Sequence, residues 1–269
     1  MHYKISIITS ILNGKNFIEE FLKDVERQTI FNECQLIMID ANSNDYVETE
    51  KYIEPFIEKY SNAEYHKIIL DDDYQERRVP GVYQVWNMAI REYAKSEILT
   101  NWNIDDRRHP KNLELHYEAL HTDPSIDLAY APVLETNSPN ETMENNSASA
   151  ILDFPEYSLD SLFKVNMPHN GPVWRASLHE EYGYFDENYF SAGDYDMWLR
   201  AALGGSQFFK IIDKPLGLYY RNPEGISSKQ STLDMAIKEV VETRQKHVKT
   251  YLQQKGNLAS PQSYSDFSL

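Results

Sequence analysis

Short apolar runs alternate with longer amphipathic segments over the first hundred residues. The apolar runs are rich in β-branched residues and predict strands, whereas apolar residues spaced three or four positions apart predict helices. The expected strands are residues 4–10, 35–40, 65–70 and 96–100, and the expected helices are residues 17–28, 47–60 and 83–94. This alternation is typical of a doubly wound α/β fold, in which right-handed crossovers join the strands of a mainly parallel sheet.

The pattern is less regular after residue 106. We expect helices at 111–121, 197–203 and 231–253, and strands at 127–132, 207–212 and 216–220, with a further short strand ending near residue 175. Residues 135–150 are rich in Asn, Ser, Thr and Glu and predict a mobile surface loop. The Ser-rich residues 256–269 predict a poorly ordered tail. We therefore expect one domain over residues 1–230 with two halves, 1–106 and 107–230, followed by a C-terminal helix and a flexible tail at 231–269.

Composition and charge narrow the function. The 269 residues are 41% hydrophobic, which is enough for a sizeable core, and the formal net charge is -16. Nucleic acid is an unexpected partner, because phosphate backbones are bound mainly by clustered Lys and Arg. A nucleotide held through a metal ion stays compatible, since the cation reverses the local charge.

The single cysteine, Cys34, excludes an internal disulfide framework and fits a reducing compartment. No stretch approaches the roughly 20 apolar residues that a membrane-spanning helix needs. We expect a soluble, cytoplasmic protein with no transmembrane segment, and peripheral membrane association stays open.

Polar residues stand where the predicted strands end. Asp40 closes the second strand, Asp105 and Asp106 follow the fourth, and Thr9 and Ser10 close the first. In an open α/β sheet the carboxyl ends of the strands form the crevice in which ligands bind. Adjacent carboxylates there could hold a hard divalent cation, or they could merely cap the next helix or form local turns.

Five short segments, taken in this order, resemble family 2 glycosyltransferases, which are inverting enzymes of the GT-A fold. The segments are Ser6–Ser10 with Asn13, Gln28-Thr29, Ile37–Asp45, Pro80–Asn87 and Asn103–Asp106. The resemblance runs from about residue 4 to about residue 228. It implies a GT-A, Rossmann-like mixed sheet flanked by helices, in which the first half binds nucleotide and metal and the second half binds the acceptor.

The resemblance also implies roles for single residues. Asp105 and Asp106 would bind Mn²⁺ or Mg²⁺ against the diphosphate of a nucleotide-sugar donor, and Asp194, placed just before a helix, would be the general base. The alternative for Asp194 is a helix N-cap, and Asp196 is the competing base, expected to face away from the site or to support Asp194. The residues expected around the donor are Thr9, Ser10, Asn13, Asp40, Arg78, Asn103, Asp105 and His169.

Several of these roles have plain structural alternatives. His169 could be structural, and Arg78 could be an exposed, solvated arginine. Two positions also depart from the family pattern: Ala41 replaces an acidic residue that contacts the base in some members, and Asn103 replaces the first acid of the metal motif. Because of Ala41, the resemblance does not predict which nucleobase the nucleotide-sugar carries.

We therefore expect an inverting, metal-assisted glycosyltransferase that moves a sugar from a nucleotide-sugar to a hydroxyl of a glycan or a lipid-linked acceptor. A non-catalytic carbohydrate-binding module would bind sugar without metal-dependent nucleotide binding. A metal-dependent nucleotide phosphohydrolase would cleave its nucleotide without an acceptor, although the sequence shows no two-metal cluster of carboxylates and histidines. Acceptor dependence separates these alternatives.

Overall fold

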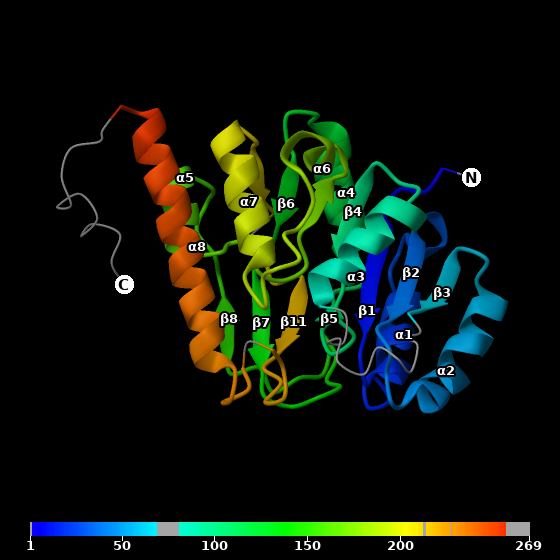
Figure 1. The fold of residues 1–269 in the computed structure, drawn as a ribbon. Coiled ribbons are helices and arrows are strands. Elements are labelled where there is room, and N and C mark those ends of the chain that lie inside the picture. Colours follow the sequence, from blue (N-terminus) through cyan, green and yellow to red (C-terminus); the bar gives the residue numbers. More distant parts are fainter. Residues whose placement is uncertain (1, 69–80, 212–213, 227, 257–269) are drawn as a thin grey trace.

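The computed structural model describes residues 2–68, 81–211, 214–226 and 228–256, and its strands form two sheets (Figure 1). In the larger sheet the strand order is β10-β6-β9-β4-β1-β2-β3, and in the smaller sheet it is β5-β11-β7-β8. Neighbouring strands of the larger sheet run parallel except that β9 is antiparallel to both β4 and β6. The expected α/β class with a mainly parallel sheet is confirmed.

The element bounds follow the chain in order. The strands are β1 Ser6–Ile11, β2 Gln35–Asp40, β3 Ala63–Lys67, β4 Ile98–Asn101, β5 Arg107–Arg108, β6 Leu128–Tyr130, β7 Val133–Thr136, β8 Ala150–Leu152, β9 Val173–Arg175, β10 Phe208–Lys210 and β11 Gly217–Tyr220. The α-helices are α1 Ile18–Glu26, α2 Tyr46–Lys59, α3 Val82–Met88, α4 Asn112–Thr122, α5 Leu159–Lys164, α6 Ser177–Tyr182, α7 Gly193–Gly204 and α8 Leu233–Gln254. A π-helical turn at Ala89–Tyr93 extends α3.

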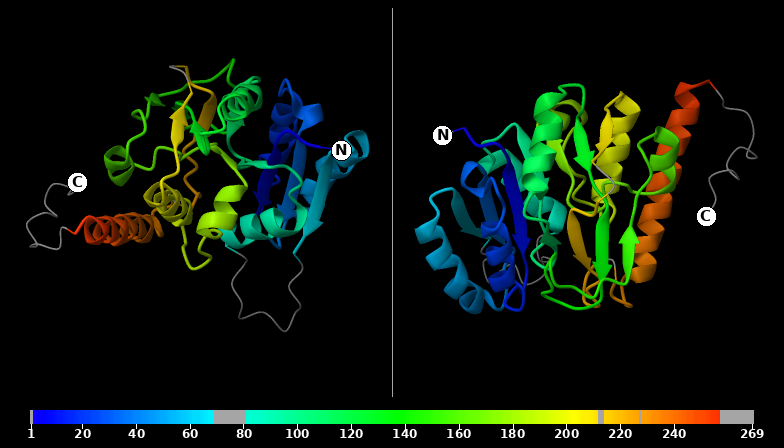
Figure 2. Two further views of the ribbon diagram at one scale, coloured as in Figure 1. Left: turned by 90° about the horizontal axis from the view of Figure 1, so that it is seen from above. Right: turned by 180° about the vertical axis from the view of Figure 1, so that it is seen from behind.

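Each face of the larger sheet carries its own hydrophobic core, because successive side chains of a strand point to opposite faces. Ile7 of β1 packs in a core with residues of α1, α2 and α4. The next residue, Ile8, packs in a second core with residues of α3, α5, α6, α7 and α8. Helices therefore cover both faces, as the two views in Figure 2 also show. No described helix is long and apolar enough to cross a membrane.

The structure corrects the expected second half in three places. Residues 135–150, predicted as a loop, begin in β7 and end in β8, which pair antiparallel and join the smaller sheet. Helix α7 begins at Gly193, four residues before the predicted start, so that Asp194 lies inside the helix. Helices α5 and α6, of six residues each, were not predicted, because such short segments carry too little periodicity.

The second core holds a buried histidine that stays neutral. His179 of α6 accepts a hydrogen bond at Nε2 from the Trp174 indole N–H (2.9 Å), and burial lowers the pKa of His179 from 6.5 to about 4. Protonation would place a charge in the core and remove this acceptor. The pKa is lower in the folded chain, so the stability that neutral His179 contributes is fully present above pH 6.5 and is lost as the pH falls through 4.

We expect His179→Gln, which cannot titrate, to remove this pH dependence. The advantage of the parent over the variant in free energy of unfolding should be largest near pH 8. It should shrink by an amount on the order of 3 kcal/mol by pH 4, since one pKa unit corresponds to about 1.4 kcal/mol. Urea unfolding of both proteins from pH 4 to 8 measures the difference. The exposed His121→Gln is the matched control, and a pH-independent difference for His179→Gln would contradict the expectation.

Candidate functional site

The loops after β1 and β2 are joined by hydrogen bonds at the carboxyl edge of the larger sheet, the lower edge in Figure 1. Asn13 donates its backbone N–H to Ser43 Oγ (2.9 Å) and accepts from the Asn44 N–H at Oδ1 (3.0 Å). Asn13 adopts a positive φ of 54°, a conformation that Asn tolerates better than most residues. The expected donor residue Asn13 therefore also fixes the relative position of the two loops.

Asp40 ends β2 and is buried at the same edge. Its Oδ1 accepts the Ser43 backbone N–H (2.7 Å), which is the local turn considered from the sequence. Its Oδ2 is also buried and has no hydrogen-bond partner among the described residues. Because a buried carboxylate oxygen without a hydrogen bond is costly, this atom is a candidate acceptor for a hydrogen bond from a bound ligand.

Thr9 and Ser10 lie at the end of β1 but face opposite sides of the sheet. Thr9 is completely buried, and its hydroxyl has no partner within the described part of the chain. Ser10 is half-buried. The Thr9 side chain lies inside the protein, so a bound nucleotide would meet the backbone of this segment rather than the Thr9 hydroxyl.

The acidic loop after β4 is held from behind by a buried arginine. Arg107 Nη1 donates to the carbonyl oxygens of Ile104 (2.8 Å) and Asp106 (2.7 Å), and the Trp102 indole N–H also donates to the Asp106 carbonyl (3.2 Å). The Asp106 N–H closes the turn on the Asn103 carbonyl (3.1 Å). These bonds fix the backbone, so the Asp105 and Asp106 side chains leave a rigid turn.

Asp106 is buried and receives hydrogen bonds from three separate parts of the chain. Its Oδ1 accepts the backbone N–H of Tyr220 (3.1 Å), and its Oδ2 accepts the amides of Asn170 (2.9 Å) and Asn103 (3.2 Å). Burial, and secondly the charge of Asp105, raise the pKa of Asp106 from 3.8 to about 7. A cation beside the two carboxylates would oppose this rise in pKa, because it favours their charged forms.

Asp105 is the more accessible carboxylate of the pair. It is half-buried, and its Oδ2 accepts the Asn222 amide (3.0 Å). The described residues contain no group of three or more His, Cys, Asp or Glu that could hold a metal ion by themselves. Two carboxylates fit a Mg²⁺-like ion that completes its shell with phosphate oxygens and water, which is how this ion usually binds beside a nucleotide.

Asp194 is the second residue of α7, and its N-cap is Ala192, so Asp194 is not the N-cap considered from the sequence. Its carboxylate accepts the Asn166 amide (3.0 Å) and the Tyr83 hydroxyl (3.3 Å). Burial raises the pKa of Asp194, and the nearby His169 opposes the rise. A half-buried carboxylate with a raised pKa is a stronger proton acceptor than an ordinary aspartate.

Asp196 faces away from Asp194, as expected. It is buried and accepts hydrogen bonds from Arg200, Lys246 and His247, each at 2.8 Å. Although burial alone would raise the pKa of Asp196, the hydrogen bonds from these three side chains hold it well below its usual range. Asp196 anchors α7 to α8.

One five-residue segment connects the two acidic centres. Asn166 donates to Asp194, and Asn170, four residues later, donates to Asp106. Four virtual Cα bonds span at most about 15 Å. The acidic loop after β4 and the first turn of α7 therefore face the same region, with the exposed His169 on the segment between them. The His169 ring lies edge-on to Tyr219 at a centroid distance of 5.2 Å.

The structure thus brings together most of the expected site, and it adds residues that the sequence did not mark. Arg78 lies outside the described residues. Asn166, Asn170 and Asn222 hold the acidic side chains in place, a role that was not predicted for them. A local signal existed for Asn170, which follows His169 directly, but its partner Asp106 is 64 residues away.

Sequence comparison identifies the family. Residues 6–182 match the family model described as glycosyl transferase family 2. The curated protein "Uncharacterized glycosyltransferase YwdF" from Bacillus subtilis (strain 168) is 24% identical over 199 residues, which are 74% of this chain and 68% of YwdF. The region that matches the family model, residues 6–182, holds Asp40, Asp105 and Asp106 and ends before α7.

Solved structures share the fold. S. aureus TarS 1-349 in complex with UDP aligns with a TM-score of 0.67 at 18% identity, covering 91% of this chain and 65% of that one. Its complex with UDP-GlcNAc gives 0.67 at 16% identity, over 89% and 66%. Mannosyltransferase PcManGT from Pyrobaculum calidifontis, in complex with GDP-Man and Mn²⁺, gives 0.59 at 16% identity, over 84% and 59%. The chain thus spans less than two thirds of these solved chains, and the likeness shows the GT-A fold.

Proposed function

The chain belongs to glycosyl transferase family 2 and is a glycosyltransferase, and we propose that it transfers a sugar from a nucleotide-sugar to an acceptor hydroxyl with inversion, using a divalent metal and Asp194 as the general base. The single observation that carries this proposal is the segment 166–170, which hydrogen-bonds to Asp194 at one end and to Asp106 at the other. This short segment limits the distance between Asp194 and Asp106, which supports a general base near a metal and phosphate site.

Residues 1–106 would bind the donor. Asp40 offers a buried carboxylate oxygen without a partner among the described residues, at the edge where the loops of Asn13 and Asn44 meet. Such an oxygen can accept from a base or ribose donor. Support comes from the similar structures that hold UDP, UDP-GlcNAc or GDP-Man.

Asp105 and Asp106 would hold Mn²⁺ or Mg²⁺ together with the donor diphosphate. The bound ion would neutralise the charge that develops on the departing nucleoside diphosphate. Asn103 would orient Asp106 through its amide rather than supply a charge. His169, exposed beside Tyr219, could donate to a phosphate oxygen or to the acceptor.

Residues 107–230 would hold the acceptor, which we propose to be a glycan or a lipid-linked saccharide. The attacking hydroxyl must lose its proton in the transition state, and Asp194 would accept it. Tyr83 and Asn166 would orient the Asp194 carboxylate, because each donates a hydrogen bond to it. A single displacement by the acceptor oxygen breaks the bond to the nucleoside diphosphate and inverts the anomeric carbon.

A thermal-shift panel tests the donor half of this proposal. We would measure the melting temperature with UDP, GDP, CDP and dTDP, each with and without Mn²⁺. A ligand that binds only the folded chain stabilises it by about 2.7 kcal/mol at 100 times its dissociation constant. We expect one nucleotide to raise the melting temperature, and only when metal is present. If none of the nucleotides raises the melting temperature, or if the rise is the same without metal, metal-assisted binding of the nucleotide-sugar is contradicted.

Transfer itself is tested with the nucleotide-sugar that matches the nucleotide selected in the panel. Release of nucleoside diphosphate should rise when a saccharide acceptor is added, and the product should carry the inverted anomeric configuration by NMR. Release that does not depend on any acceptor would instead favour a phosphohydrolase.

A further inference from the structure

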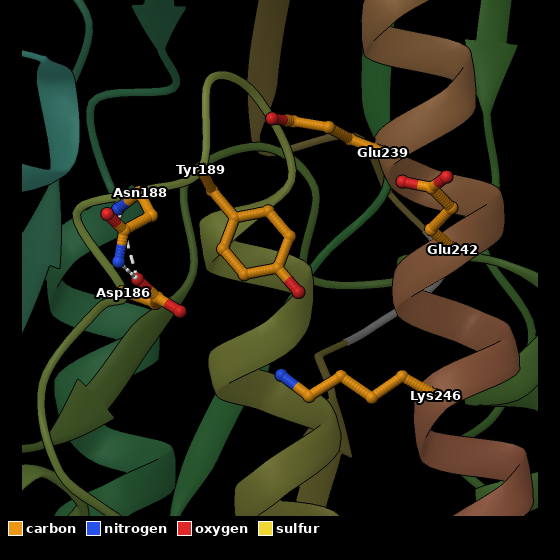
Figure 3. Close-up of a pocket in the computed structure, with 6 residues that line it drawn as sticks. All are labelled: Asp186, Asn188, Tyr189, Glu239, Glu242 and Lys246. Atoms are coloured by element: carbon orange, nitrogen blue, oxygen red, sulfur yellow. Dashed lines mark hydrogen bonds between the residues drawn. The ribbon is translucent and has the colours of Figure 1, made fainter.

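The carboxylate of Glu239, in the second turn of α8, accepts hydrogen bonds from the backbone of the loop that precedes α7. Its Oε1 accepts the N–H of Phe190 (2.7 Å), and its Oε2 accepts the N–H groups of Ser191 (2.7 Å) and Ala192 (3.1 Å). The Ser191 hydroxyl adds a fourth bond (3.2 Å). Figure 3 shows Glu239 extending from α8 toward this loop, at the rim of a pocket of about 400 Å³.

One of these bonds, to the N–H of Ala192, serves the start of α7 itself, because Phe190 and Ser191 lie before the N-cap of the helix. The first N–H groups of a helix have no partner within the helix, and a side chain at the N-cap usually satisfies one of them. The N-cap here is Ala192, which has no side-chain acceptor. Glu239, 47 residues further along the chain, binds the N–H groups that lead into the helix and places a negative charge at its positive end.

The same contacts determine where Asp194 lies. Ala192 is two residues before Asp194, and the Ser191 carbonyl accepts the Tyr83 hydroxyl (2.7 Å), which also donates to Asp194. Gly193 packs its backbone directly on the Tyr83 ring, because a Cβ at this position would lie 2.7 Å from a ring carbon. A shift of the loop would therefore move both Asp194 and the hydroxyl that orients it.

Helix α8 holds α7 on the other side of Asp194 as well. Asp196, two residues after Asp194, is bound by Lys246 and His247 of α8. Asp194 thus lies between two points at which α7 is attached to α8.

We propose that Glu239 is a positioning residue for glycosyl transfer: it fixes the loop of residues 190–192 and thereby keeps Asp194 at the reacting hydroxyl. The inference rests on the proposed role of Asp194 as the general base. Glu239 touches neither Asp194 nor the metal site in the described contacts. Its effect should therefore fall on the transfer step and leave nucleotide binding unchanged.

The test compares Glu239→Gln with Glu242→Gln. Glu242 lies one turn further along α8 and lines the same pocket, but its side chain is exposed and forms an ion pair with Lys238 of the same helix (3.7 Å). Gln keeps the shape of Glu239 but replaces one acceptor oxygen by an amide that cannot accept. Each variant is assayed for kcat, for KM of the acceptor, for metal-dependent nucleotide binding and for melting temperature.

We expect Glu239→Gln to lower kcat by up to about 100-fold, the effect that a displacement of about 1 Å can have, while nucleotide affinity stays at the parent value. Glu242→Gln should keep the parent kcat. The acid limb of the kcat profile should also move to lower pH in Glu239→Gln, since a loosened loop hydrates Asp194. The groups facing Asp194 are Tyr83, Asn166 and His169, and none of them is altered by the substitution.

Three results would overturn the inference: an unchanged kcat in Glu239→Gln, an equal fall in Glu242→Gln, or a fall in kcat that tracks a loss of nucleotide binding and of melting temperature. If Glu239→Gln does not fold, Glu239→Asp, which keeps the charge on a shorter side chain, carries the test and should give a smaller fall in kcat. Asp194→Asn separates the two proposals. If that variant keeps full transfer, the assigned base is wrong; if it loses transfer while Glu239→Gln does not, only the positioning role is wrong.

Discussion

Asp194→Asn is expected to lower kcat by about 10²- to 10⁴-fold, the usual contribution of a general base, while metal-dependent nucleotide binding stays intact. Asn has nearly the shape of Asp and can still accept the Asn166 amide, but it cannot take up a proton. The proposed contacts to the nucleotide-sugar lie on the loops after β1, β2 and β4, which the substitution does not touch. Transfer assays at saturating donor, combined with nucleotide titrations, measure the two effects separately.

The same role predicts the pH dependence of the unaltered chain. Asp194 must be ionised to accept a proton, and burial raises its pKa. We therefore expect kcat to fall with decreasing pH at values above the ordinary aspartate range, and this acid limb should be absent from the residual activity of Asp194→Asn.

Asp186→Asn is the matched control for Asp194→Asn. Asp186 lies in the loop before α7, where it accepts from the backbone and side chain of Asn188 and lines the pocket beside α8. It should keep kcat near the parent value. A parent-like kcat in Asp194→Asn would assign the base elsewhere, and a weakened nucleotide affinity in that variant would mean that Asp194 also contributes to the donor site.

Asp106→Ala is expected to abolish the metal-dependent part of nucleotide binding. The substitution removes one of the two proposed metal ligands, and a single remaining carboxylate holds a hydrated divalent ion poorly. It also leaves the donors of Tyr220, Asn103 and Asn170 without their acceptor. Because a buried donor without a partner costs about 1–3 kcal/mol, the free energy of unfolding should fall as well.

Two measurements separate these effects. Urea unfolding without ligand gives the loss of stability, and the additional shift caused by nucleotide with Mn²⁺ gives the loss of binding. Asn170→Ala is the control, since it removes one hydrogen bond to Asp106 and leaves both carboxylates. It should be destabilised yet keep a metal-dependent shift. A full metal-dependent shift in Asp106→Ala would exclude Asp106 as a ligand.

The sequence predicted the first half of the fold closely, and the physical reason is its regular period. The predicted strand at 35–40 coincides with β2, and the predicted helix at 47–60 differs from α2 by one residue at each end. In long apolar or amphipathic segments, the local hydrophobic pattern predicts both the element and its buried face, so the prediction does not depend on distant contacts. The same pattern predicted the edge of the sheet at which a ligand is expected, because the carboxyl ends of parallel strands lie on one side.

The second half depends on contacts that no local pattern records. β7 and β8 pair across a polar segment that was predicted as a loop, and their strands have only four and three residues. The start of α7 was placed too late because its first turn, Gly193 to Asp196, contains two acids and a glycine. Glu239 satisfies the N–H groups before this turn, and a carboxylate 47 residues away cannot be inferred from the turn itself.

The site residues divide in the same way. Asp40, Asp105 and Asp106 could be proposed as site residues because Asp40 ends one predicted strand and Asp105 and Asp106 follow another. The amides that orient them come from other parts of the chain, as Asn222 does for Asp105 across 117 residues. Thr9 shows the opposite limit, because the sequence placed it at the correct edge but could not tell that its hydroxyl is completely buried.

The arginine behind the acidic loop keeps this loop in one shape whether or not a ligand is bound. Arg107 holds the loop through two carbonyl oxygens, and it is itself buried and fixed by the Asn140 amide (2.8 Å). The turn that carries Asp105 and Asp106 therefore has its shape before any ion arrives. If metal and nucleotide bind here as proposed, they would meet a preorganised site, and their binding would not have to offset the entropy lost on ordering the loop. Exchange of Mn²⁺ for Mg²⁺ at the proposed site should then leave the backbone of this loop unchanged.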